Sequence, residues 1–307
     1  MFDKKILITG VAGFIGNHIA LSFSQKKQHV FGIDIRPQEE IPLIDRYLSL
    51  KLPSDDIGTV IRDYQPDICI HCAGPSSVYY SVKNPVTDFN ACALATLNLL
   101  DAMRQNSPGC KIVFLSSAAV YGNSITPSIG EDHPLTPISP YGFHKRIAEE
   151  ICKEYAVVYG LKTACVRIFS AYGPGLKRQV LWDICRKAIM QPELILEGTG
   201  NETRDFVHVA DIVSAINIIA EKGLFIGEVY NVASGRETLI RDLANLLLKS
   251  LNKPGCIRFN GDIAASIPHK WKADISKLRS MGYIPEITLE NGIEGYVKWV
   301  RKELSQE

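Results

Sequence analysis

The sequence of 307 residues lacks an excess of charge of either sign, since 34 Lys and Arg residues stand against 33 Asp and Glu residues. Nucleic-acid-binding proteins usually show a basic surplus or a basic patch, so we expect no nucleic-acid partner. Cysteine is also sparse: eight residues are scattered from Cys69 to Cys256, too few and too dispersed for a disulfide framework in a chain of this length. This distribution predicts reduced thiols.

Long apolar runs are missing as well. No stretch approaches the roughly 18–20 apolar residues that span a bilayer. The first strand pattern begins at Lys5, which leaves no room for a secretory signal before it. We therefore expect a cytoplasmic protein without a membrane contact. Disorder is disfavoured because 46% of the residues are hydrophobic and the net charge is only +1.

Short apolar runs rich in β-branched residues alternate with helical patterns through the first two thirds of the chain. The predicted strands are Lys5–Thr9, His29–Asp34, Ile68–His71, Lys111–Ser116, Thr163–Phe169 and Glu228–Asn231, and the predicted helices are Phe14–Lys26, Asp56–Tyr64, Val86–Gln105, Tyr141–Tyr159 and Asp211–Glu221. Such alternation predicts a parallel sheet with helices on both faces. The fold class is therefore α/β, a doubly wound sheet of the Rossmann type.

The rest of the chain lacks this alternation and has glycine-rich and charged segments between short helical patterns. We expect residues 1–173, joined again by 208–233, to form a dinucleotide-binding domain. Residues 174–207 and 234–307 would then form a smaller carboxyl-terminal lobe that binds the substrate. Ligands of doubly wound sheets bind at the carboxyl ends of the strands, so the site should lie between that edge and the lobe.

The first predicted strand runs into a glycine-rich turn, Gly10, Gly13 and Gly16, with the spacing GxxGxxG. Glycines at such a turn let the backbone approach a pyrophosphate, which then meets the amino-terminal end of the following helix. Asp34, at the end of the second strand, could accept hydrogen bonds from ribose hydroxyls and would repel a 2′-phosphate, which favours NAD over NADP. Arg36 could pair with a 2′-phosphate, so NADP stays open. The alternative for Asp34 is a solvated acid at a strand end.

Three further residues form a pattern for proton transfer. Tyr141 and Lys145 are four apart at the start of a predicted helix and therefore share a face. A neighbouring ammonium lowers the pKa of a phenol, which makes tyrosine usable as an acid/base near neutral pH. Ser117, at the end of a strand, could donate a hydrogen bond to the same substrate oxygen. A Tyr-x-x-x-Lys pair alone would more often be two surface neighbours.

Two other patterns have structural explanations. Cys69 and Cys72 are three apart on a predicted strand, so their side chains should point to opposite faces and not share a metal. His71 and His208 are expected to be structural histidines rather than ligands. No metal site is predicted.

Together these motifs resemble the extended short-chain dehydrogenase/reductase family, in its NAD-dependent nucleotide-sugar epimerase/dehydratase branch. The resemblance covers nearly the whole chain. It rests on Thr9–Gly16, Asp34, His71–Gly74, Asn90, Ser116–Gly122, Tyr141 with Lys145, Arg167–Gly175, Gly198–Asp211 and Glu228–Gly235.

The resemblance implies roles for individual residues. The catalytic residues would be Ser117, Tyr141 and Lys145, with Tyr141 as the acid/base on a sugar hydroxyl. The NAD-binding residues would be Gly10, Gly13, Phe14, Ile15, Gly16, Asp34, Ile35, Arg36, Cys72, Ala73, Gly74, Asn90, Tyr141, Lys145 and Phe169. The residues binding a nucleoside-diphosphate sugar would be Ser76, Ser117, Ser170, Gln179, Trp182 and Arg204.

Some of these assignments have alternatives. Arg204 could form a salt bridge with a nearby carboxylate instead of binding a diphosphate, and Trp182 could belong to the core of the lobe. Lys177 and Arg178 are weaker phosphate candidates. The helix Val86–Gln105 could form half of the four-helix bundle of a homodimer, as in similar enzymes, or pack within the monomer.

One departure from the family pattern helps to choose among the possible reactions. Dehydratases of this branch carry Asp-Glu after the catalytic hydroxyl, whereas this chain has Ala118 and Ala119, which disfavours a dehydratase. We expect a 4-epimerase that oxidises carbon 4 of the sugar transiently. The alternatives are a reductase of a 4-keto nucleotide sugar that consumes NADH or NADPH, and a cofactor-binding protein without catalysis.

Overall fold

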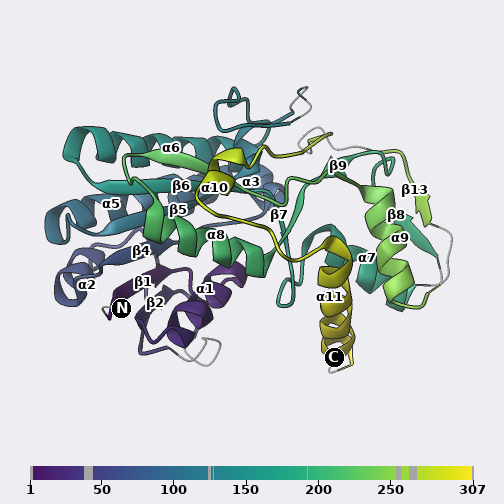
Figure 1. The fold of residues 1–307 in the computed structure, drawn as a ribbon, viewed down its shortest axis with the longest axis horizontal. Coiled ribbons are helices and arrows are strands. Elements are labelled where there is room, and N and C mark those ends of the chain that lie inside the picture. Colours follow the sequence, from purple (N-terminus) through teal and green to yellow (C-terminus); the bar gives the residue numbers. More distant parts are fainter. Residues whose placement is uncertain are drawn as a thin grey trace.

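The computed structural model describes residues 3–37, 44–123, 126, 128–191, 193–253, 257–262 and 268–305. Its centre is a seven-stranded parallel sheet with the order β11-β6-β5-β4-β1-β2-β3 (Figure 1). The strands are β1 (Lys5–Thr9), β2 (His29–Asp34), β3 (Arg46–Ser49), β4 (Ile68–His71), β5 (Lys111–Ser117), β6 (Lys162–Ile168) and β11 (Glu228–Val232). The chain runs outward from β1 to β3 and then continues with β4 on the other side of β1. The strand order therefore reverses between β1 and β4, as in a Rossmann sheet. The predicted α/β fold class is confirmed.

Helices cover both faces of this sheet. On one face α1 (Phe14–Gln25) and α8 (Val209–Lys222) pack with residues such as Ile6 and Ile8. On the other face α2 (Ile57–Tyr64), α5 (Ala95–Asn106) and α6 (Pro140–Tyr159) pack with residues such as Leu7 and Phe114. Both faces of every central strand are therefore buried, which explains why the strands are continuously apolar.

Two elements differ from the sequence prediction. The edge strand β3 was not predicted, because its four residues lie at the surface or are only half-buried and carry no run of apolar side chains. The segment predicted as one helix, Val86–Gln105, consists of α4 (Pro85–Phe89), a π-helical turn η2 (Asn90–Leu94) and α5. A π turn inserts one residue into a helix and often lies at a functional site. Here it directly follows α4, which comes after the short helix α3 (Val78–Lys83).

The second lobe is built around α7 (Gln179–Met190), α9 (Ile240–Ser250) and α11 (Leu289–Leu304), whose shared core includes Leu243 and Tyr296. Short strands complete it: β7 (Ser170–Tyr172) pairs with β10 (Phe206–His208), β8 (Leu194–Leu196) with β13 (Ile257–Phe259), and β9 (Thr203–Arg204) with β12 (Thr238–Leu239). Trp271 and Tyr283, on either side of α10 (Ser276–Ser280), pack against the main core instead. The division into domains at 173, 208 and 234 stays a prediction.

The cysteines are unpaired wherever the structure describes them, and Cys256 lies outside the described residues. Cys69 and Cys72 belong to the cores on opposite faces of the sheet, as predicted. In the described part of the chain, no cluster of three His, Cys, Asp or Glu side chains could hold a metal ion. None of the helices described there is long and apolar enough to cross a membrane.

Candidate active site

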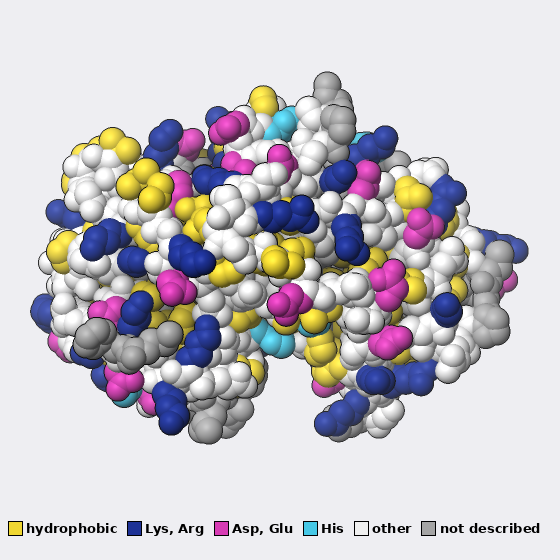
Figure 2. Space-filling view, in the orientation of Figure 1, with side chains coloured by type: hydrophobic (Ala, Val, Ile, Leu, Met, Phe, Trp, Pro, Cys, Tyr) yellow, Lys and Arg dark blue, Asp and Glu magenta, His cyan; other side chains and the backbone are white. Residues whose placement is uncertain are grey.

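A cavity of about 1060 Å³ lies at the carboxyl ends of β1, β2 and β4. Its other wall is the segment 174–178 together with Trp299 of α11. In the space-filling view the surface is hollowed between the two lobes (Figure 2), and α1 and α11 lie on the two sides of this region in the ribbon view (Figure 1). Ten of the predicted ligand-binding residues line this cavity: Gly10, Gly13, Phe14, Asp34, Ile35, Arg36, Cys72, Ala73, Gly74 and Ser76.

The glycine-rich turn brings the backbone of β1 close to that of β4. Gly10 has φ +71°, and a Cβ there would lie 2.7 Å from the backbone nitrogen of Ala73. A Cβ at Gly16 would lie 2.2 Å from the carbonyl oxygen of Gly10. The helix α1 then begins after Gly13, without a side-chain cap and without an acidic residue in its first turn. Its free N–H groups therefore face the cavity and fit the diphosphate of a dinucleotide.

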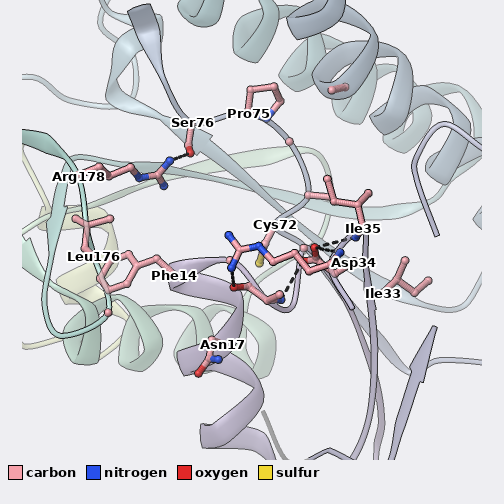
Figure 3. A pocket seen from close by; sticks show the side chains of 18 of the residues that line it. Phe14, Asn17, Ile33, Asp34, Ile35, Cys72, Pro75, Ser76, Leu176 and Arg178 are labelled. Carbon is pink, nitrogen blue, oxygen red and sulfur yellow. Dashed lines mark hydrogen bonds between the residues drawn. The ribbon is translucent and has the colours of Figure 1, made fainter. Parts of the chain in front are cut away.

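Asp34 is held in place by three backbone donors (Figure 3). Its Oδ2 accepts a hydrogen bond from the N–H of Ala12 at 2.9 Å, and its Oδ1 accepts from Ile35 at 2.8 Å and Arg36 at 3.2 Å. Because a carboxylate offers about four lone-pair sites, capacity remains for ribose hydroxyls. The guanidinium of Arg36 donates to the Ala12 carbonyl at 3.0 Å and so lies beside the same carboxylate.

The predicted catalytic residues come from two elements that approach closely. Ser117 ends β5, and its Oγ accepts a hydrogen bond from the N–H of Ala119 in the following 3-10 turn. Gly142, in the first turn of α6, packs so near this turn that a Cβ would lie 2.5 Å from the Ala119 carbonyl oxygen. The amino-terminal end of α6, which carries Tyr141 and Lys145, is therefore held against the end of β5 that carries Ser117.

Lys145 is buried, and its ammonium has a defined position. Nζ donates to the Leu115 carbonyl at 2.7 Å and lies 4.7 Å from the centre of the Phe114 ring. Burial opposes the charged form, but the surrounding acidic groups, Tyr141 and Asp88 among them, outweigh it and raise the pKa of Lys145. A protonated lysine within electrostatic range of the phenol favours the phenolate. This is the arrangement that acid/base catalysis by Tyr141 requires.

A buried ion pair beside these residues was missed by sequence reasoning. Arg167 of β6 and Glu149 of α6 are paired at 2.7 Å, and both side chains are about 5% exposed. Ser116 donates a hydrogen bond to the same carboxylate, and Arg167 donates to the hydroxyl of Tyr121 at 2.9 Å. The network ties α6 to the ends of β5 and β6, so it fixes the elements that carry Ser117, Tyr141 and Lys145.

The three predicted catalytic residues, Ser117, Tyr141 and Lys145, do not line the cavity, and neither do the remaining predicted residues. Asn90 is exposed on the π turn, and Ile15 and Gly16 pack beneath the glycine-rich turn. Phe169 is buried, with its ring centre 6.0 Å from that of Trp271. Ser170, Gln179 and Trp182 lie at the junction with the second lobe, where Trp182 packs 5.7 Å from the ring of Trp299. Ligand contacts of all these residues stay predictions.

Arg204 lies in the second lobe with its guanidinium 5.4 Å from the centre of the Trp271 ring. It donates to the carbonyl oxygen of Thr203 at 2.7 Å, and burial lowers its pKa to about 10. Among the described residues no carboxylate lies within ion-pair distance of it, so the salt bridge considered as the alternative is not found there. A desolvated guanidinium of this kind suits a phosphate or another anion.

The second wall of the cavity includes Lys177 and Arg178, the weaker phosphate candidates of the sequence. The segment 174–178 crosses its mouth, and the guanidinium of Arg178 donates a hydrogen bond to Ser76 on the opposite side (Figure 3). Trp299 was missed, because no sequence pattern marks it and only the packing of α11 brings it to the cavity.

Comparison with known proteins agrees with this geometry. Residues 6–233 match the family described as NAD dependent epimerase/dehydratase. A candidate UDP-glucose 4-epimerase of Methanocaldococcus jannaschii is 32% identical, over 96% of this chain and 98% of the relative. The crystal structure of the Thermotoga maritima UDP-glucose 4-epimerase with UDP-glucose has a TM-score of 0.91 and 26% identity, over 98% of this chain and 99% of that one.

The Bacillus cereus UDP-glucuronic acid 4-epimerase, solved with UDP-glucuronic acid and NAD, has a TM-score of 0.90 and 26% identity. That alignment covers 97% of this chain and 99% of the other. The family match spans well over half of the chain, and the fold and the cavity agree with it. This chain belongs to the NAD-dependent epimerase/dehydratase family.

Proposed function

We propose that this protein is an NAD-dependent nucleotide-sugar 4-epimerase that acts on a UDP-sugar. The observation that carries the proposal is the start of α6, where Tyr141 and the buried Lys145 are held against the end of β5 that carries Ser117. Relatives bound to UDP-glucose, or to UDP-glucuronic acid and NAD, support the choice of cofactor and nucleotide.

The chain's own residues account for binding. The open end of α1 and Asp34 fit NAD, which, when bound, supplies hydride chemistry at the sugar carbon. Arg204 would hold the substrate diphosphate. These contacts would place the sugar between the cavity and Tyr141.

Proton transfer then falls to Tyr141. Its phenolate, favoured by Lys145, would take the proton of the 4-hydroxyl and return it after the sugar presents its other face. Ser117 would donate a hydrogen bond to the same oxygen. Ala118 and Ala119 are both buried and carry no acid, which favours an epimerase over a dehydratase.

The first prediction concerns Tyr141. In the Tyr141→Phe variant we expect epimerisation to fall at least about 10²-fold, the usual contribution of a general acid/base, with NAD affinity unchanged. Turnover is followed by NMR with UDP-glucose and UDP-glucuronic acid, and NAD binding by calorimetry. Tyr159→Phe, at the exposed end of the same helix, is the control. Full activity of Tyr141→Phe would contradict the assignment.

The same assay separates the reductase alternative. An epimerase turns over many substrate molecules without consuming added NADH, whereas a reductase consumes one NADH for each 4-keto sugar. Binding of cofactor without turnover on any UDP-, GDP-, CDP- or dTDP-sugar would favour a protein without catalysis.

We also propose that the protein is a homodimer. Eight large apolar side chains are exposed on the contiguous elements α3, α4, η2 and α6: Tyr79, Tyr80, Val82, Val86, Phe89, Leu94, Phe143 and Ile147. Exposed apolar patches of this kind mark protein–protein interfaces. A second copy is the natural occupant because paired helices from each copy would form a bundle.

The second prediction tests this interface. Phe143→Glu should convert the protein to a monomer in sedimentation equilibrium, because it introduces a charge into the apolar patch. Val157→Glu changes an equally apolar, exposed residue near the far end of α6 and should leave the mass unchanged. A monomeric wild-type protein would overturn the proposal.

A further inference from the structure

A short irregular segment between β13 and α10, residues 269–273, is bonded to two distant parts of the chain, and we call it the strap. On one side it meets the loop that follows β5. There the N–H of His269 donates to Oδ1 of Asn123 at 2.9 Å, and the carbonyl oxygen of Lys272 accepts from the N–H of Ile129 at 2.8 Å.

On its other side the strap is bonded to both neighbours of Arg204. The N–H of Thr203 donates to the carbonyl oxygen of His269 at 2.9 Å. The buried carboxylate of Asp205 accepts a hydrogen bond from the N–H of Ala273 at 3.1 Å. The strap therefore joins the short strand that carries Arg204 to the loop beyond Ser117.

Trp271 lies at the centre of the strap and is only 9% exposed. Its Nε1 donates a hydrogen bond to the carbonyl oxygen of Gly122 at 3.1 Å. This acceptor ends residues 117–122, which begin with Ser117 and which we call the Ser117 turn. Gly122 has φ +65°, and a Cβ there would lie 1.9 Å from the carbonyl oxygen of Thr136. Such close packing leaves the acceptor little freedom to move.

The same indole ring lies under the guanidinium of Arg204, whose centre is 5.4 Å from the ring centre. The acidic side chain that acts electrostatically on Arg204 is Glu202, but its carboxylate accepts hydrogen bonds from the N–H groups of Thr199 and Gly200. An aromatic ring attracts a guanidinium through its face and does not use the N–H groups that bind phosphate oxygens. The ring can therefore hold Arg204 in place without competing with a diphosphate.

We propose that Trp271 is a positioning residue, which fixes the guanidinium of Arg204 relative to the Ser117 turn. It thereby sets the separation between the substrate diphosphate and the reacting hydroxyl. This inference rests on the proposed function, in which Arg204 holds the diphosphate and Ser117 bonds the hydroxyl. The indole joins the two because its ring contacts one and its N–H bonds the other.

The first test removes the ring. Trp271→Met leaves an apolar side chain in the core, and we expect the Kd of UDP to rise about tenfold with the Kd of NAD unchanged. Arg204→Met should weaken UDP binding by itself. Adding Trp271→Met to Arg204→Met should weaken it no further, because Trp271 acts through Arg204. Calorimetry with UDP on the NAD-loaded protein measures all four combinations.

Phe23→Met is the matched control. Phe23 is 6% exposed in the same core as Trp271, and Nζ of Lys26 lies 5.9 Å from its ring centre. It lies in the last turn of α1, away from the strap. This variant should lose stability in thermal unfolding and keep the wild-type affinity for UDP.

The second test keeps a ring and removes only the N–H. In Trp271→Phe, Arg204 still lies over an aromatic face, so UDP affinity should stay close to the wild-type value. The bond to Gly122 is lost, and we expect kcat on the UDP-sugar to fall about tenfold because the hydroxyl is no longer aligned. A purely structural role of Trp271 would instead weaken UDP and NAD binding together.

The outcomes are distinct. Equal effects of Trp271→Met with and without Arg204→Met, or equal losses of UDP and NAD affinity, overturn the inference, while epimerisation by the wild type still supports the proposed function. If Trp271→Met does not fold, Trp271→Phe decides, and a wild-type kcat there overturns the inference. A wild type that does not bind UDP overturns the role given to Arg204 and the inference with it.

Failure of the proposed function alone gives a different result. The wild type would then epimerise no UDP-sugar, yet the effect of Trp271→Met on UDP binding would still depend on Arg204. The positioning role of Trp271 would stand in that case.

Discussion

Among single residues, His71 links three elements of the main domain. It is almost completely buried on β4, with Nδ1 2.6 Å from the hydroxyl of Thr9 on β1 and Nε2 3.2 Å from that of Thr96 on α5. Burial and then the nearby charge of Lys145 lower its pKa to about 3. The folded protein therefore keeps this ring neutral, which confirms the structural role predicted for it.

The third prediction follows from this shift. Because the pKa of His71 is lower in the folded state than in the unfolded state, the unfolded chain binds the extra proton first. Folding stability is complete above about pH 6.5 and falls by about 1.4 kcal/mol for each pH unit below it, down to about pH 3. His71→Gln should therefore lose less stability than the wild type between about pH 7.5 and pH 5. Urea unfolding measures the difference.

The control for this prediction is His29→Gln, which alters an exposed histidine that pairs with Asp3 at 3.8 Å. It should follow the wild type at both pH values. Equal acid sensitivity of His71→Gln and the wild type would contradict the argument.

At the scale of elements, the β1–α1 turn shows that close contact between two backbone segments requires glycine. Gly10 combines a positive φ with a close approach to Ala73, so it has no room for a side chain. The fourth prediction is that Gly10→Ala abolishes measurable NAD binding in calorimetry and lowers the free energy of unfolding by about 1 kcal/mol or more. Gly109→Ala, where a Cβ would meet nothing within 4 Å, should bind NAD normally. Normal binding by Gly10→Ala would contradict this account of the turn.

Some features of these elements could be predicted from the sequence and others could not. Buried central strands and the Tyr141–Lys145 spacing are local patterns, so both were predictable. The π turn at Asn90–Leu94 was not, because its helical periodicity continues on both sides. Glu149 and Arg167 pair across 18 residues, and only the packing of α6 on the sheet unites them. Ser76 and Arg178 meet across a cavity for the same reason.

At the scale of the whole molecule, the exterior agrees with the balanced composition. Side chains of both signs are interspersed on the face shown in Figure 2, without a large region of one charge. Cations are instead placed locally, with Arg36 and Arg178 on the cavity and Arg204 beyond it in the second lobe. A protein with a net charge of only +1 therefore has cations where the diphosphates of NAD and of the proposed substrate would bind.

The segment 174–178 has a kinetic consequence. His18 of α1 donates to the Pro174 carbonyl at 3.0 Å, Tyr296 donates to the Leu176 carbonyl at 2.8 Å, and Arg178 bonds Ser76. These three partners belong to different parts of the fold, so opening this segment of the cavity wall would require several bonds to break together. The fifth prediction is that NAD remains bound through purification and dissociates far more slowly than the enzyme turns over.

Arg178→Ala should shorten the residence time of NAD several-fold in a competition experiment with labelled cofactor, because it removes the hydrogen bond to Ser76. Arg186→Ala, on the exposed side of α7 where it faces Asp183 at 3.8 Å, should leave the residence time unchanged. Rapid exchange of NAD in the wild type would contradict this picture. A cofactor that stays for many cycles serves a reaction that returns its hydride each time, so the slowness of its escape would itself distinguish an epimerase from a reductase.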